Sequence, residues 1–140
     1  MVELSNELKT KLGYNLRRSS VLMMNDLSRE LGEFGLKVTD ATSLMVIGEN
    51  EGCSQTEVGV ALATKRANMV PIVQRLRERG LIDRVRTDGR AQALHLSEDG
   101  RVMVSQLKQM LLEHERRFTD RLSKREFQTL MQLLQKVRGI

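Results

Sequence analysis

The chain has 140 residues, a formal net charge of +5, 40% hydrophobic and 29% charged residues, and one cysteine. These values are typical of a folded domain with a core, and the length favours a single domain over residues 1–140. The sequence has neither the roughly 20-residue apolar run of a membrane helix nor the apolar segment of a secretory signal, and the lone cysteine excludes an internal disulfide. We therefore expect a cytoplasmic protein without membrane association.

The first predicted element is a long helix, Leu4–Leu31. Its apolar residues recur at helical spacing on one face: Leu8, Leu12, Leu16, Met23, Leu27 and Leu31. Ser19 and Ser20 fall on the same face. Gly32 and Gly35 then predict a break in the chain.

The middle of the chain contains two predicted helix starts. Thr39 is expected to cap a second helix that ends before Gly52. Ser54 and Glu57 have the three-residue spacing of a capping box, which begins a third helix, Gln55–Leu62.

A turn at residues 63–64 leads to a predicted fourth helix, Lys65–Arg79, which contains Pro71 and is ended by Gly80. Proline inside a helix removes one backbone hydrogen bond. The core face of this helix is predicted from its spacing to be Met69, Ile72, Val73 and Leu76.

The periodicity then changes to that of a hairpin. Residues 81–86 and 92–96 are predicted strands, joined by a tight turn at Asp88-Gly89. Ser97 is expected to cap a helix that runs to about Phe118, and a second capping box, Ser123 to Glu126, begins the last helix.

The excess positive charge lies in one segment. Residues 54–96 contain eight basic and four acidic side chains, a net +4 of the total +5. Aromatic residues make up only 3% of the chain, too few for a base-stacking surface of the kind that binds single strands or RNA. The charge pattern therefore favours duplex DNA as the partner.

The order helix, turn, helix, hairpin is that of a DNA-reading module whose second helix enters the major groove. Arg66 suits guanine and Asn68 suits adenine, because each side chain can make two hydrogen bonds to that base. In the hairpin, Arg86 and Arg90 are expected to reach the minor groove, with Asp88 orienting an arginine. The other predicted contacts are Thr64 and Arg75 to phosphates and Lys65 and Gln74 on the open side of the helix.

The segments Arg75–Arg84, Asp88–Arg90 and Leu94–Arg101 resemble the helix-to-wing passage, the wing signature and the following helix of the MarR family of bacterial regulators. The resemblance extends from about residue 36 to residue 101. It implies a mainly α fold with a β-hairpin wing, namely a winged helix-turn-helix at residues 36–96 between helical dimerisation regions at residues 1–35 and 97–140.

That resemblance also implies a mode of action. It predicts a homodimeric repressor that binds a pseudo-palindromic operator, with Arg90 in the minor groove, and that a small molecule releases from DNA. The effectors expected from the family are phenolic or aromatic carboxylic acids and their thioesters, including CoA thioesters. This chain departs from the family pattern in its short wing, in Pro71 inside the recognition helix, and in Cys53 at a position that usually carries a larger apolar residue.

The serines on the first helix allow two interpretations. Ser19 and Ser20 either let another helix pack closely or line an effector pocket. In the second interpretation, the pocket also contains the adaptable side chains of the methionines and a flanking cation, from Met23, Met24, Arg17 and Arg18.

Three alternatives to a ligand-responsive repressor remain. One is an architectural or protein-interaction module without an effector, and another is a redox regulator based on Cys53, which we instead expect to be a buried structural residue. An enzyme is disfavoured because no catalytic motif is present. His95 and His114 are expected on the surface, without the spacing of metal ligands, and no cofactor is expected.

Overall fold

The computed structural model describes residues 1–87, 89 and 92–140, so the predicted wing residues Asp88 and Arg90 lie outside the described part. The chain divides into two compact units. The larger unit is Leu27–Gln109, and the smaller one combines Met1–Asp26 with Met110–Ile140. Among the described helices, none has the length and apolar character needed to cross a membrane.

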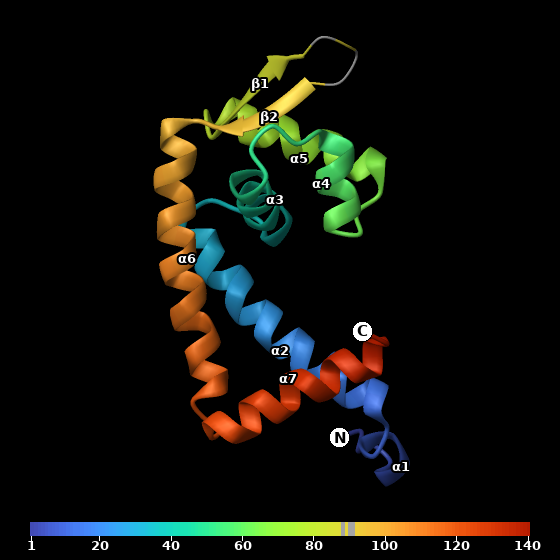
Figure 1. The fold of residues 1–140 in the computed structure, drawn as a ribbon. Helices are drawn as coiled ribbons and strands as arrows, with labels where there is room; N and C mark the ends of the chain where they lie inside the picture. The colour runs from blue at the N-terminus through green and yellow to red at the C-terminus, as the bar shows by residue number, and fades with distance from the viewer. Residues whose placement is uncertain (88, 90–91) are drawn as a thin grey trace. The chain divides into compact units, whose positions relative to one another are not determined.

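The larger unit contains the end of α2 (Leu12–Glu33), three whole helices, a hairpin and the first part of α6 (Glu98–Thr119) (Figure 1). Its strands are antiparallel, with Ile82 opposite Leu96 and Arg86 opposite Gln92, as predicted. A further bridge joins Cys53 to Leu94. The elements that lie wholly within this unit are α3 (Val38–Glu49), α4 (Gln55–Ala61), α5 (Arg66–Glu78), β1 (Ile82–Arg86) and β2 (Gln92–Leu96).

The core of the larger unit is formed by apolar side chains from every one of these elements. The predicted core face of α5 is confirmed, because Met69, Ile72, Val73 and Leu76 are all buried. Leu44 and Ile47 of α3 are fully buried in the same unit. This packing fixes which face of α5 is turned outward.

Local hydrogen bonds set two of the helix starts in the larger unit as predicted. The Ser54–Glu57 capping box is present at α4, and the hydrogen bonds from Ser54 lower the pKa of Glu57. At α6 (Glu98–Thr119), the Ser97 hydroxyl accepts from the Gly100 amide at 3.0 Å. Gly100 must be glycine, because a Cβ there would collide with the Leu81 carbonyl oxygen.

Two predicted helix boundaries are wrong. The expected helix Leu4–Leu31 is divided into α1 (Asn6–Lys9) and α2 (Leu12–Glu33). The Thr10 hydroxyl donates to the Glu7 carbonyl at 2.8 Å and helps to end α1. The Asn15 amide donates to the carbonyls of residues 9 and 11, which satisfies backbone groups at the break.

The second wrong boundary concerns α3. Thr39 lies inside the first turn, and the N-cap is Lys37, which makes no side-chain capping bond. The buried Leu36 immediately precedes this cap. Burial of Leu36 in the core therefore fixes where α3 begins. The helix starts nearer the N-terminus than the cap predicted at Thr39 would place it.

The smaller unit contains α1, most of α2, the end of α6, and α7 (Lys124–Arg138). Its second capping box, Ser123–Glu126, is confirmed. Within the described residues of this unit, only Met110 and His114 are buried. Many of its large apolar side chains are exposed, among them Leu8, Leu12, Leu16, Leu22, Leu130, Leu133 and Val137.

The expectation that His114 lies on the surface is wrong. The side chain is buried, and its Nδ1 lies 2.9 Å from Oδ2 of Asp26. The Arg117 guanidinium donates to the same oxygen at 2.6 Å, and the Phe118 ring packs edge-on against the imidazole. Asp26, 88 positions away in the sequence, gives this polar ring a hydrogen-bond partner, which offsets the cost of burying it.

Candidate nucleic-acid interface

The predicted reading side chains lie on the surface of α5. Lys65, Arg66, Asn68 and Gln74 are all exposed. Lys65 is the N-cap of the helix, and Gln74 donates to the Glu78 carboxylate at 3.0 Å. Exposure near the start of the second helix of a helix-turn-helix is what contact with base edges requires.

Several open grooves border α5 within the larger unit, and one of them, beside the end of the helix and β1, contains the carboxylates Glu78 and Asp83. Two others lie beside the first residues of the helix. The groove on the hairpin side is lined by Ser54, Gln55, Thr56, Arg66, Arg84, Gln92 and Leu94. The groove on the α3 side is lined by Lys37, Thr39, Ala63, Thr64, Lys65, Asn68, Pro71, Ile72 and Arg75. Each of these two grooves combines cationic side chains with hydroxyl or amide groups, and neither has a carboxylate in its lining.

The grooves separate the predicted base readers. Arg66 lines the hairpin-side groove, whereas Asn68 lines the α3-side groove. The helix face opposite the buried residues includes the exposed Ala67, Val70, Pro71, Gln74 and Glu78, of which Pro71 also lines the α3-side groove. The first six residues of α5 therefore present an uncharged centre with polar and cationic borders, and the exposed Glu78 lies at the end of the helix.

Arg75, a predicted phosphate contact, makes a two-point contact inside the protein. Its Nη2 and Nε donate to the Asp40 carboxylate at 2.7 and 3.2 Å. Asp40 is buried, while 37% of the Arg75 side chain is exposed, and the bond raises the pKa of Arg75. The pair fastens α5 to α3, a role that sequence reasoning missed because the partners are 35 residues apart.

The turn before α5 and the end of the helix are also held by polar contacts. The half-buried Thr64, another predicted phosphate contact, donates its hydroxyl to the Leu62 carbonyl at 3.3 Å. Arg79 donates to the carbonyls of Phe34 and Gly35 at 2.9 and 2.8 Å. Arg79 therefore holds the loop that precedes α3 against the end of α5.

A side-chain hydrogen bond attaches the middle of β1 to the start of α4. Arg84 donates to the Gln55 side chain at 3.2 Å, and Arg86 is exposed at the end of β1. The predicted contacts of Asp88 and Arg90 fall outside the described residues.

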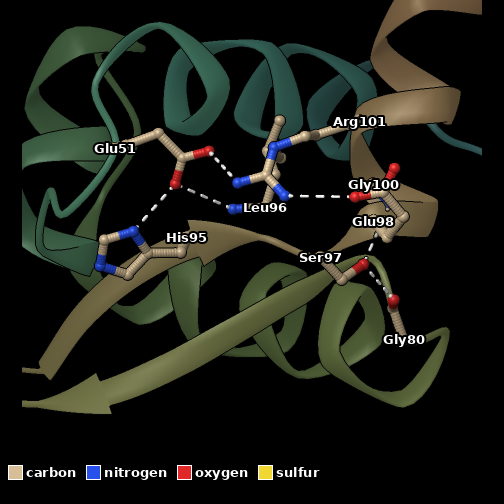
Figure 2. A network of polar contacts seen from close by, with 8 residues as sticks. All are labelled: Glu51, Gly80, His95, Leu96, Ser97, Glu98, Gly100 and Arg101. Carbon is tan, nitrogen blue, oxygen red and sulfur yellow. Dashed lines mark hydrogen bonds and ion pairs between the residues drawn. The ribbon is translucent and has the colours of Figure 1, made fainter.

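Glu51, in the connection between α3 and α4, joins three elements (Figure 2). Its Oε2 lies 2.9 Å from Nδ1 of His95 and accepts from the Leu96 amide at 3.2 Å, while its Oε1 lies 3.6 Å from the Arg101 guanidinium. Ser97 donates to the Gly80 carbonyl in the same region. This network links the base of the hairpin to the first turn of α6.

The predicted effector residues all lie on the part of α2 that belongs to the smaller unit. Met23 is half-buried, and the remaining five are exposed: Arg17, Arg18, Ser19, Ser20 and Met24. Their role in effector binding stays a prediction.

Cys53 is half-buried, and burial, with Glu57 and Glu51 nearby, raises the pKa of its thiol. A raised pKa keeps the thiol protonated, which disfavours a redox-sensing role. In the part of the chain that the structure describes, no three His, Cys, Asp or Glu side chains gather in a way that could hold a metal ion.

Sequence comparisons identify related regulators. A family model described as the MarR family matches residues 34–91. A protein described as a transcriptional regulator of the hcr operon in Thauera aromatica is 31% identical, over 91% of this chain and 78% of the relative.

Solved structures of similar fold include the transcriptional repressor CouR bound to a 23-mer DNA duplex, with a TM-score of 0.89 and 29% identity over 98% of this chain and 99% of that one. CouR bound to p-coumaroyl-CoA has a TM-score of 0.86 and 28% identity over 97% and 98% of the two chains. A transcriptional regulator from Pseudomonas aeruginosa has a TM-score of 0.83 and 30% identity over 93% and 98%. The predicted mainly α fold with a winged helix-turn-helix is confirmed.

Proposed function

Because this chain belongs to the MarR family of transcriptional regulators, we propose that it is a homodimeric repressor that binds operator DNA and is released by an aromatic acyl-CoA. The observation that carries the proposal is the likeness, over 98% of the chain, to a repressor bound to duplex DNA. Such a regulator acts on chromosomal DNA in the cytoplasm and catalyses no reaction.

The two grooves beside the first residues of α5 support DNA binding independently of the family. A helix in the major groove has a phosphate backbone on either side of it. The hairpin-side groove offers Arg66 and Arg84, and the α3-side groove offers Lys37 and Lys65. Phosphates of the two strands lie along these grooves, while Arg86 and Arg90 of the wing reach the adjacent minor groove.

The homodimer is supported by the exposed apolar side chains of α1, α2 and α7. A second copy of the chain covers these side chains and places two winged modules on a pseudo-palindromic operator, with half-sites about one helical turn apart.

DNA binding is tested with a duplex that the wild-type protein selects from a random-sequence library, with affinity measured by fluorescence anisotropy. Arg66→Ala should weaken binding by about 1–3 kcal/mol, mainly at one base position of each half-site. Arg138→Ala, which removes the same charge from the last turn of α7, serves as the control and should leave affinity nearly unchanged. If the wild-type protein enriches no duplex, the DNA-binding function is wrong.

The effector class rests on the likeness to CouR bound to p-coumaroyl-CoA. CoA carries phosphates, which suit the exposed cations Arg17 and Arg18, whereas Met23 and Met24 suit an aromatic acyl group. We expect p-coumaroyl-CoA to release the selected duplex, and coenzyme A and p-coumaric acid alone to do so poorly. The double variant Arg17→Ala, Arg18→Ala should need at least about tenfold more thioester for release. DNA binding that is insensitive to the thioester would refute this effector class but not the DNA-binding function.

A further inference from the structure

We propose that Ala67, Val70 and Pro71 form an apolar patch that packs against thymine methyl groups in the major groove. This inference rests on the DNA-binding function proposed above. It names the feature of the bases that the centre of α5 recognises.

The patch lies where a recognition helix meets base edges. Its three residues fall within the first six of α5 and on the face opposite the buried Met69 and Ile72. All three are exposed, and Val70 is 52% exposed. Because Met69 and Ile72 are packed in the core, the apolar side chains of the patch are exposed to solvent at the position where DNA contact is expected.

The borders of the patch indicate its partner. Arg66 and Arg84 line the groove on one side, and Lys37 and Lys65 line the groove on the other. An apolar protein surface would not match these cations, whereas two phosphate strands with a groove between them match both borders. Duplex DNA is therefore the partner that matches both the apolar patch and the cations on either side of it.

The side chains of the patch determine what it can recognise. Ala67, Val70 and Pro71 have no side-chain donor or acceptor, so they cannot read the hydrogen-bonding pattern of a base pair. The one apolar group that the major groove presents is the C5-methyl of thymine. We therefore expect each half-site to contain thymines under the centre of α5, flanked by the pairs that Arg66 and Asn68 read.

The test uses a duplex that the wild-type protein has selected from a random-sequence library. Each thymine of one half-site is replaced in turn by deoxyuridine, which removes the methyl group and keeps every hydrogen-bonding group. For the wild-type protein, at least one replacement should reduce affinity about fourfold, the effect of uncovering one buried methyl. Val70→Ala should bind the thymine and deoxyuridine duplexes equally at the position that Val70 contacts.

Val102→Ala is the matched control. Val102 is 53% exposed and lies on α6, so it equals Val70 in residue type, helical setting and exposure. This variant should keep the full wild-type sensitivity to deoxyuridine. Alanine favours helices, so Val70→Ala is expected to remain folded, which a thermal melt followed by circular dichroism checks.

The other outcomes separate the two proposals. If the wild-type protein binds its selected duplex and no deoxyuridine weakens it, the methyl-reading patch is refuted and DNA binding stands. If Val70→Ala retains the wild-type sensitivity at every position, the assignment of Val70 is refuted. If no duplex is enriched at all, the DNA-binding function and this inference fail together.

Discussion

The two units of the chain differ most in where their apolar side chains lie. In Leu27–Gln109, apolar residues of α3, α5 and the hairpin bury one another. In the smaller unit, Met110 is the one buried apolar residue among those described, while leucines and valines of α2 and α7 are exposed. The larger unit thus has a packed core within one chain, whereas the smaller unit leaves exposed the apolar surface that the proposed second copy would cover.

The largest expected effect is on the core of the larger unit. Leu44→Ala removes a fully buried side chain of α3 and should lower the free energy of unfolding by about 3 kcal/mol, measured by urea denaturation. Val60→Ala, at a 77% exposed position on α4, should change it by less than about 0.5 kcal/mol. Equal losses in the two variants would contradict the view that this unit has its own packed core.

A smaller effect is expected on α7, and it should concern assembly. Leu133 is 52% exposed in the single chain, and Leu133→Ser should raise the dimer dissociation constant by about tenfold or more, measured by analytical ultracentrifugation. Gln132→Ser changes an exposed polar neighbour and should leave assembly unchanged. If the Leu133→Ser variant dimerises as tightly as the wild-type protein, this face of α7 does not form the interface.

The smallest effect should have the opposite sign. Ser43 of α3 is fully buried, and its hydroxyl has no hydrogen-bond partner among the residues that the structure describes. Ser43→Ala removes this unpaired polar group and should increase the free energy of unfolding by about 1 kcal/mol. A loss of stability in thermal or urea unfolding would instead mean that the hydroxyl stabilises the fold.

Features that depend on neighbouring residues were predictable from the sequence. Both capping boxes and the core face of α5 are present because short spacings determine them. The hairpin strands also follow the predicted bounds to within one residue. The exposure of Lys65, Arg66 and Asn68 followed from that core face, since residues outside it are not covered by the packing of the larger unit.

Features that depend on distant residues were not predictable in this way. Asp40 and Arg75 are 35 positions apart, and Asp26 and His114 are 88 positions apart. Neither pairing leaves a periodic signal, so the sequence pattern predicts only a DNA contact for Arg75 and a surface position for His114. The start of α3 was misplaced for the same reason, because the burial of Leu36 decides it.

The outward face of α5 also bears on how such a regulator changes over evolutionary time. Ala67, Val70 and Pro71 lie outside the core, so a substitution there alters the surface that we propose to contact DNA, while the packing of Met69, Ile72, Val73 and Leu76 is kept. After gene duplication, one copy can acquire a new target site through single codon changes in this short stretch. The division of one helix into a stabilising side and a recognising side thus lets new regulatory circuits arise from an unchanged scaffold.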